Sequence, residues 1–361
     1  MGFSCGLVGL PNVGKSTLFN ALTAAGAAMA NYPFCTIEPH VGKVGVPDTR
    51  LGVLAGIAQS QRILPAMMAF TDIAGLVKGA SKGEGLGNKF LSHIREVDAL
   101  AHVVRCFEDG DIIHVDGSVD PIRDIGVIDT ELALADLEVV EKAIQREQKK
   151  ARGQDKDAQV FCEFAQRLLD HMQKGAPARS MEIAESERPL LNVLNLMTAK
   201  PVLYIANVSE ADLPSGRNRH VEAVEKHAAL SGDKVIPICG RMEMEIQQLP
   251  EDERPAFLAD MGLKEPGLNT LIRTGYDLLG LQTYFTVGPK ETRAWTVHKG
   301  ARAPQAAGVI HSDFERGFIR AETISYKDYV DCQGEKGARE KGLLRTEGKD
   351  YVMREGDVMH F

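Results

Sequence analysis

The chain has little of what marks a secreted or membrane-bound protein. Its six cysteines are scattered and include no C-x-x-C pair, which indicates buried thiols in a reducing compartment rather than disulfides or a zinc site. No apolar run approaches the roughly 20 residues needed to span a bilayer, and no signal peptide is visible. We therefore expect a cytoplasmic protein that has no membrane partner.

An excess of positive charge is missing as well. The 42 lysines and arginines are outnumbered by 50 aspartates and glutamates, for a net charge of −8. This balance argues against a general affinity for nucleic acid, although it is compatible with a local basic patch. The 361 residues, of which 44% are hydrophobic and 25% charged, suffice for two or three globular domains.

What the chain does have is a phosphate-binding motif. The segment Gly9–Ser16, GLPNVGKS, fits G-x-x-x-x-G-K-[ST] and lies between an apolar run at Phe3–Leu10 and a helical pattern from Ser16 onward. In this context backbone N–H groups surround a polyphosphate at a helix N-terminus, Lys15 reaches the terminal phosphates, and the Ser16 hydroxyl reaches Mg²⁺. The predicted phosphate site consists of Asn12, Val13, Gly14, Lys15, Ser16 and Thr17.

A second motif predicts a sensor of the terminal phosphate. Asp72-Ile73-Ala74-Gly75 follows the strand-like run Ala66–Phe70. At such a place the Asp72 carboxylate holds Mg²⁺ through water, and the Gly75 N–H reaches the γ-phosphate. Between the two motifs, Thr36 lies in a proline-punctuated loop and is the candidate to close over the ion. The sequence thus predicts a Mg²⁺ site formed by Ser16, Thr36 and Asp72.

The base-reading motif departs from the GTPase pattern. After a buried strand expected at Pro201–Ala206, the chain has Asn207-Val208-Ser209-Glu210 where GTPases usually have Asn-Lys-x-Asp. The longer Glu cannot keep the two hydrogen bonds that Asp accepts from guanine, and Val208 has no stem to cover the base, so we expect guanine specificity to be weakened or lost. The predicted base site consists of Asn207, Val208 and Glu210, together with Cys239 and Gly240, which follow a strand at Lys234–Ile238 and replace the usual Ser-Ala.

These motifs together closely resemble those of the YchF group of Obg-related translation-factor P-loop GTPases. The segments Arg293–Thr296 and Ala303–Gly308 look like that group too, so the resemblance covers essentially the whole chain. It implies an ATPase of the GTPase superfamily that associates with ribosomes. The residues themselves indicate only a weakened guanine site, whereas the preference for ATP is an implication of the resemblance.

The catalytic step lacks its usual glutamine. Many GTPases orient the attacking water with a Gln directly after Asp-x-x-Gly, and here that position is Leu76. Either hydrolysis is slow until a partner acts, or another group substitutes. His114 is our candidate, because it follows the strand expected at Ala99–Cys106 in a Gly/Asp-rich loop that could fold toward the phosphates; the alternative is a locally hydrogen-bonded loop histidine. The catalytic set is thus His114, Lys15 and Gly75.

Asn12 suggests a second cation. Relatives with Asn at this position of the phosphate loop use it to hold K⁺ beside the phosphates, which supplies charge otherwise given by an arginine finger. The alternative is that Asn12 merely stabilises the loop.

The long interval between Asp72 and Asn207 predicts an insertion. Two apolar stripes at helical spacing, one from Ala133 to Ile144 and one from Phe161 to Met172, flank the polar stretch Gln148–Gln159. We interpret them as an antiparallel helical hairpin closed by a helix over Pro189–Ala199. Basic side chains around its tip indicate either a solvated face or contact with ribosomal RNA: Lys142, Arg146, Lys149, Lys150, Arg152 and Lys156.

The C-terminal part changes character after about residue 280. Strand patterns at Gln282–Val287 and Ala294–Val297 precede a helical pattern at Pro304–His311, and this order resembles the small β-grasp module called TGS, a binding or structural unit. Further strand-like pieces are expected at Gly317–Ala321, Asp350–Met353 and Asp357–Phe361.

The predicted fold class is therefore α/β, with three parts. A P-loop nucleotide-binding domain comprises residues 1–127 and 200–280, a helical insertion residues 128–199, and a TGS-like β-grasp domain residues 281–361. We expect a monomeric, Mg²⁺-dependent hydrolase that prefers ATP to GTP and acts as a switch on ribosomes through the hairpin and the TGS-like domain. The alternatives are a GTP-specific switch and a nucleotide-gated binding protein with negligible turnover.

Overall fold

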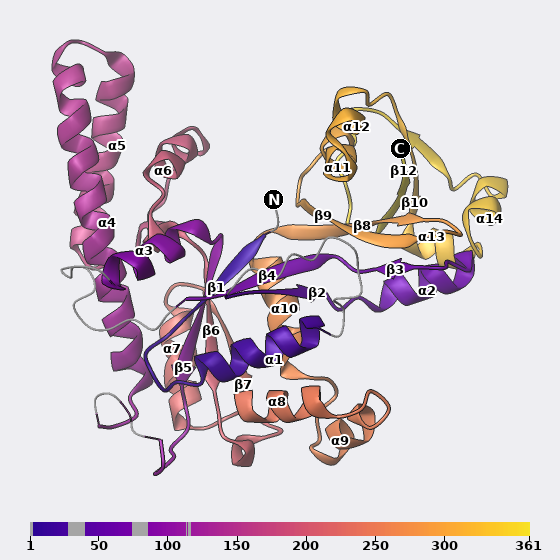
Figure 1. Cartoon of the computed structure of the whole chain (residues 1–361). Helices are drawn as coiled ribbons and strands as arrows, with labels where there is room; N and C mark the ends of the chain where they lie inside the picture. The colour runs from indigo at the N-terminus through magenta and orange to yellow at the C-terminus, as the bar shows by residue number, and fades with distance from the viewer. Residues whose placement is uncertain (1–2, 28–39, 74–85, 113, 115–116) are drawn as a thin grey trace.

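The computed structural model describes residues 3–27, 40–73, 86–112, 114 and 117–361, and these residues form two six-stranded sheets (Figure 1). The first sheet has the order β2-β4-β1-β5-β6-β7, in which β2 is antiparallel to β4 and every other pair is parallel. Its inner strands are mostly apolar because helices cover both faces. The bounds are β1 Ser4–Val8, β2 Val41–Gly45, β4 Met67–Asp72, β5 Ala99–Arg105, β6 Val202–Asn207 and β7 Lys234–Ile238.

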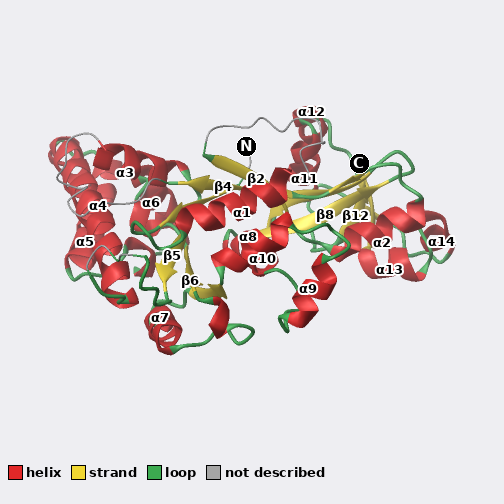
Figure 2. Cartoon of the chain, turned by 60° about the horizontal axis from the view of Figure 1, so that its bottom comes forward, coloured by secondary structure: helices red, strands yellow, loops and turns green. Residues whose placement is uncertain are grey.

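Helices cover both faces of this sheet. In Figure 1, α1, α8 and α10 lie on one side of it, and α3, α4 and α7 lie on the other. Figure 2 shows α1, α8 and α10 together on the side turned toward the viewer. The bounds are α1 Lys15–Ala27, α3 Leu86–Glu96, α7 Arg219–Ala229, α8 Gly240–Gln248, α9 Arg254–Asp260 and α10 Gly267–Leu278.

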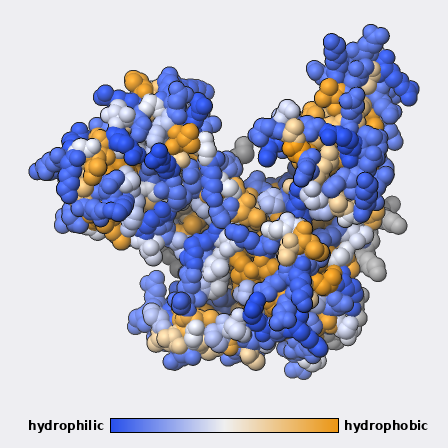
Figure 3. All heavy atoms as spheres, turned by 180° about the vertical axis from the view of Figure 1, so that it is seen from behind, coloured by the Kyte–Doolittle hydropathy of each residue, from blue (hydrophilic) through white to orange (hydrophobic). Residues whose placement is uncertain are grey.

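Two long helices project from the first sheet. Helix α4 (Pro121–Arg152) begins with Asp120 as N-cap and proline in its first turn, and helix α5 (Lys156–Gln173) turns back along it and has Asp155 as N-cap. Their shared core includes Val140, Ile144, Phe161, Phe164 and Leu168. In Figure 3 the projecting pair, at the upper right, is covered mostly by hydrophilic side chains.

The helix boundaries differ from those expected from the sequence. Only residues 153–155 separate α4 from α5, so most of the polar stretch Gln148–Gln159 is helical, because polar side chains are tolerated on exposed helix faces. Because α4 begins at Pro121, the domain boundary predicted after residue 127 falls inside this helix. The helix predicted over Pro189–Ala199 is shorter: α6 (Arg188–Leu194) ends where Asn195 adopts φ +45°, and the 3₁₀ turn η3 (Met197–Ala199) follows.

The second sheet has the order β11-β10-β12-β8-β9-β3. The helix expected at Pro304–His311 is α11, and the strand expected at Asp357–Phe361 is β12. Two other expected strands differ: the strand predicted at Gly317–Ala321 begins only at Ala321, and Asp350–Met353 contributes a single bridge, from Val352 to Arg302, because a turn precedes it. The bounds are β8 Leu281–Val287, β9 Thr292–His298, β10 Ala321–Ser325, β11 Arg345–Glu347, β12 Asp357–His360, α11 Ala303–Ile310, α12 Ser312–Arg316, α13 Tyr326–Asp331 and α14 Glu335–Glu340.

The two sheets are joined by the segment that follows β2. Strand β3 (Ile63–Leu64), which precedes β4 of the first sheet, pairs in parallel with β9 of the second. Arg50 of α2 (Thr49–Ala58) forms ion pairs with Asp48 and Glu355, and its guanidinium lies 5.1 Å from the centroid of the Phe285 ring. In the described part of the chain, no helix combines the length and the apolar character needed to cross a bilayer.

Candidate nucleotide-binding cavity

A cavity of about 1270 Å³ opens at the carboxyl ends of β1, β5 and β6. This is where open α/β sheets commonly bind ligands, because the loops that follow parallel strands meet there. The predicted residues of the phosphate and base motifs contribute most of one side of it. The lining consists of Leu10, Pro11, Asn12, Gly14, Lys15, Ser16, Thr17, Phe107, Glu108, Asp109, Ile112, Asn207, Val208, Ser209, Glu210, Ala211, Cys239, Arg241 and Met261.

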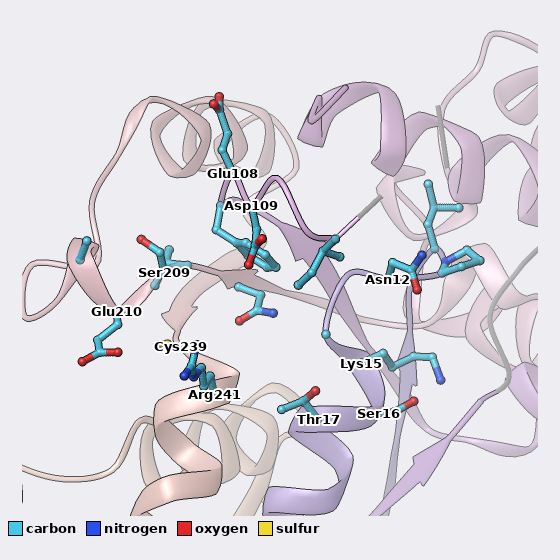
Figure 4. Close-up of a pocket in the computed structure, with 18 of the residues that line it drawn as sticks. Asn12, Lys15, Ser16, Thr17, Glu108, Asp109, Ser209, Glu210, Cys239 and Arg241 are labelled. Carbon is cyan, nitrogen blue, oxygen red and sulfur yellow. The ribbon is translucent and has the colours of Figure 1, made fainter. Parts of the chain in front are cut away.

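The phosphate loop has the backbone that the motif requires. Asn12 and Gly14 have φ values of +64° and +90°, in the left-handed region that turns successive N–H groups inward. A Cβ on Gly9 would lie 2.7 Å from the Val103 carbonyl oxygen, so this position accepts only glycine. Helix α1 begins directly behind the loop, and Figure 4 shows Asn12, Lys15 and Ser16 together at one end of the cavity.

Lys15, which lines the phosphate end, contacts Asp72. Their side chains form an ion pair, and Lys15 as a residue is 8% exposed. The lysine of the phosphate motif and the aspartate of the sensor motif, 57 positions apart in the chain, are thus brought together. Ser16 lies in the first turn of α1, beside Lys15.

These side chains fit Mg²⁺. A carboxylate and a hydroxyl are hard oxygen ligands, and Mg²⁺ is usually held by one or two protein groups together with substrate phosphates and water. Within the described residues there is no cluster of three or more His, Cys, Asp or Glu side chains that could hold a metal. Asp72 and Ser16 would hold Mg²⁺. Thr36 and Gly75, the other predicted residues of the switch, lie outside the described residues, as does Leu76.

Asn207 connects the phosphate loop with the base motif. Its side-chain Nδ2 donates to the Val13 carbonyl oxygen at 2.8 Å, and its Oδ1 accepts from the Gly240 N–H at 3.0 Å. The side chain is buried, so both hydrogen bonds form in a low-dielectric environment, where an unmade bond is costly. A Cβ on Gly14 would lie 2.1 Å from Asn207 Nδ2, which explains why the loop needs glycine beside this asparagine.

The rest of the base motif forms the opposite end. Val208 is buried and packs in the core at the edge of the cavity, and its N–H donates to the Ile238 carbonyl oxygen. Glu210 is exposed in the 3₁₀ turn η4 (Glu210–Asp212), and Figure 4 shows it far from Lys15 across the cavity. Burial raises the pKa of the Cys239 thiol, which keeps it neutral.

One wall of the cavity was not predicted. It consists of the loop after β5, which contributes Phe107, Glu108, Asp109 and Ile112, and it is completed by Arg241 and Met261. The sequence holds one weak signal for it, Arg105, an arginine at the end of a mostly apolar strand.

His114 lies apart from this cavity. It is buried, its Nε2 is 2.8 Å from Asp124 Oδ2 in the first turn of α4, and it is absent from the described lining. The imidazole of His114 therefore lies against α4 and not at the cavity. From the sequence, this histidine is expected to face the phosphates. The imidazole instead contacts the buried carboxylate of Asp124 on α4, because a buried polar group needs a hydrogen-bond partner. Whether His114 takes part in catalysis stays a prediction.

Comparison with known proteins decides the family. The ribosome-binding ATPase YchF of Escherichia coli O157:H7 is 56% identical over 361 residues, which cover 100% of this chain and 99% of that protein. The protein of the same name from Bacillus subtilis strain 168 is 54% identical over 363 residues, with the same coverage. The chain belongs to the YchF family.

Two family models and a solved structure agree with this assignment. Residues 281–361 match the model of the YchF-GTPase C-terminal region, described as a protein of unknown function, and residues 4–151 match the model described as 50S ribosome-binding GTPase. The YchF GTPase of Schizosaccharomyces pombe superimposes with a TM-score of 0.91 at 41% identity, over 99% of this chain and 97% of that one. The family predicted from the motifs is therefore confirmed, and so is the α/β P-loop GTPase fold with a further C-terminal domain. The loop of residues 107–112, which forms the unpredicted wall of the cavity, lies within the segment that matches the GTPase model.

Proposed function

We propose that this chain is a ribosome-associated, Mg²⁺-dependent ATPase that acts as a nucleotide-dependent switch in translation or the stress response. Its relatives from Escherichia coli and Bacillus subtilis are named ribosome-binding ATPases, and they align over the whole chain. Within the chain itself, the residues at the base end of the cavity support the proposal most directly. There Val208 and Glu210 stand where a guanine-specific site has lysine and aspartate.

The positions of these two residues support a site that has lost its specificity for guanine. A guanine site gains specificity from a carboxylate that accepts two hydrogen bonds, and it discriminates strongly because the pairing is lost with another base. Glu210 is exposed in a short 3₁₀ turn, and the buried Val208 leaves the base without a lysine stem. The base end of the cavity therefore discriminates only weakly against adenine.

A calorimetric titration tests the proposal. We expect MgATP to bind at least about tenfold more tightly than MgGTP, a difference of about 1.4 kcal/mol. Tighter binding of GTP would instead support the GTP-specific switch. If ATP binds but ribosomes leave a negligible turnover unchanged, the chain is a nucleotide-gated binding protein.

Catalysis requires parts of the site to come together around the phosphates. In our proposal Ser16, Thr36 and Asp72 hold Mg²⁺, Lys15 and the Gly75 N–H contact the terminal phosphate, and Asn12 is a candidate K⁺ ligand. Because Lys15 and Asp72 are paired with each other, the lysine must exchange the carboxylate for phosphate when nucleotide binds. Turnover measured in KCl and in NaCl tests the K⁺ ligand, and equal rates would count against it.

His114 becomes catalytic in this proposal only after it leaves Asp124. Single-turnover hydrolysis with ribosomes present should fall in His114→Ala, whereas nucleotide affinity should stay unchanged. Asp124→Asn, which weakens the charged partner of the imidazole, is the matched variant and should change the rate less. Unchanged hydrolysis in His114→Ala rejects the role.

Ribosome contact is assigned to the projecting helices and the C-terminal module, which we interpret as a helical hairpin and a TGS-like β-grasp domain. Near the turn between α4 and α5, Lys149, Lys150 and Arg152 are exposed, and exposed cations are what contact with an RNA backbone requires. The double variant Lys149→Gln/Lys150→Gln should weaken co-sedimentation with ribosomes. The exposed Lys226→Gln/Lys264→Gln pair on the nucleotide domain is the control. Equal binding of both variants would contradict the contact. We further propose a monomer that functions in the cytoplasm.

A further inference from the structure

A fully buried arginine lies just outside the recognised motifs. Arg105 ends β5, and its residue is 1% exposed. Burying a guanidinium is costly unless its donors are hydrogen-bonded. Over the described ranges of the chain, no carboxylate forms an ion pair with Arg105, so this charge is compensated in another way.

Its donors are directed to the backbone of a single loop. Nε donates to the Phe107 carbonyl oxygen at 3.2 Å, Nη1 to that of Ile112 at 3.0 Å, and Nη2 to that of Asp109 at 3.3 Å. The guanidinium carbon also lies 4.6 Å from the centroid of the Phe107 ring. A planar fork with separate donors can reach three carbonyl groups at once, which a single ammonium cannot.

The loop held in this way is the unpredicted wall of the cavity. Phe107, Glu108, Asp109 and Ile112 all line it. A second set of contacts reaches the loop from α7: Asn218 Nδ2 donates to the Cys106 carbonyl oxygen at 2.8 Å, and Arg219 forms an ion pair with Glu108. Arg105 is buried beneath the loop, whereas the Arg219–Glu108 pair is exposed to solvent and therefore weak.

We propose that Arg105 is a positioning residue that shapes the nucleoside side of the cavity through the backbone of residues 107–112. It touches no substrate itself. It fixes the wall against which the base and ribose bind, and it leaves the phosphate loop unaffected. This inference rests on the assignment of the cavity to a nucleotide.

Titration with two ligands distinguishes an effect on the nucleoside end of the cavity from an effect on the phosphate end. The titrations use MgATP and Mg-tripolyphosphate, which carries the phosphates without a nucleoside, on the full chain. In Arg105→Lys, which keeps the charge and loses the fork, MgATP affinity should fall about tenfold, and tripolyphosphate affinity should stay within about twofold of the wild type. In steady state the KM for ATP should rise by about the same factor, with kcat changed by less than about threefold.

The matched control is Arg254→Lys. Arg254 also donates to two backbone carbonyl groups, those of Leu249 and Gln247, but it does not line the cavity. This variant should leave both affinities unchanged. Arg105→Gln, which removes the buried charge, should show the same split as Arg105→Lys and serves if the lysine variant does not fold.

Three outcomes would overturn the proposal: unchanged MgATP affinity, an equal loss for both ligands, or failure of both Arg105 variants to fold, which a purely structural role predicts. The proposed function fails separately, in the wild type, if GTP binds more tightly than ATP. In that case the Arg105 split is measured with MgGTP and still decides the role of Arg105.

Discussion

The two ends of the cavity are built in different ways. The phosphate end is mainly backbone: a loop with two left-handed residues, a helix N-terminus, and one lysine. The base end is assembled from side chains of separate segments, with Phe107, Ser209, Glu210 and Arg241 among them. A backbone site binds any polyphosphate, whereas discrimination between bases depends on side chains that can differ without disturbing the loop. We infer that nucleotide choice can change in this fold while phosphate binding is kept.

The largest effect is expected from Lys15→Ala. Removing the cation at the terminal phosphates should lower kcat/KM for ATP roughly 100- to 1000-fold, because charge in the transition state loses a preorganised partner. If the phosphate end does not discriminate between bases, affinities for MgATP, MgGTP and Mg-tripolyphosphate should all fall by a similar factor. Lys226→Ala, an exposed position on α7, is the control for each titration. A loss of affinity for only one of the two nucleotides would contradict the inference that the phosphate end does not discriminate between bases.

Asn207→Ala should have the next largest effect, because this side chain belongs to both ends. It removes the hydrogen bonds to the Val13 carbonyl oxygen and the Gly240 N–H and leaves two buried groups unpaired. At about 1–3 kcal/mol for an unpaired buried group, nucleotide affinity should fall roughly 10- to 100-fold. Binding of tripolyphosphate should also weaken, since Val13 belongs to the phosphate loop. Asn192→Ala, at an exposed position, is the control, and an effect on ATP alone would show that Asn207 serves only the base end.

The same difference between the two ends explains what could be predicted from sequence. The predicted phosphate site is local: eight consecutive residues and the strand and helix beside them are sufficient to propose it, and Asn12, Lys15 and Ser16 line one end of the cavity. The buried strand before Asn207 is equally evident as an apolar run. The wall formed by residues 107–112 could not be predicted. Arg105 holds it through hydrogen bonds to backbone carbonyl groups, which every residue has, so no residue type marks them in the sequence. The partner of His114, Asp124, was hidden in the first turn of a helix that begins earlier than its apolar stripe.

A smaller effect is expected from restoring the guanine pattern. In Val208→Lys/Glu210→Asp, GTP affinity relative to ATP should rise about tenfold, because aspartate can accept two hydrogen bonds from guanine and lysine can cover the base. The single variant Glu210→Asp should show less. Tripolyphosphate affinity should stay unchanged in both, as expected for a change confined to the base end. Because Val208 is buried, its replacement is also checked by thermal unfolding. An unchanged ratio of GTP to ATP affinity would place base discrimination elsewhere, with the wall of residues 107–112 as the next candidate.

The smallest effect on nucleotide binding is expected from His102→Phe, in the sheet beneath both ends. His102 is buried in β5, with its ring 5.6 Å from that of Tyr204, and burial, together with the charges of His227 and Arg179, lowers its pKa from 6.5 to about 3. Below pH 6.5 the unfolded chain binds a proton at this site that the folded chain excludes. The contribution of His102 to the free energy of unfolding is therefore fully present above pH 6.5. Below that pH the free energy of unfolding decreases by about 1.4 kcal/mol per pH unit as the pH falls toward 3.

His102→Phe removes this titrating group and keeps a ring of similar size against Tyr204. The loss of unfolding free energy between pH 7.5 and 5.5, measured by urea denaturation, should be smaller in the variant by about 1 kcal/mol. The exposed His360→Phe should behave like the wild type. ATP and tripolyphosphate affinities at pH 7.5 should stay within about twofold of the wild type, because neither end of the cavity uses this side chain. A loss of ATP affinity in His102→Phe would mean that the base end depends on the packing of the whole sheet, and it would weaken the inference drawn from Arg105.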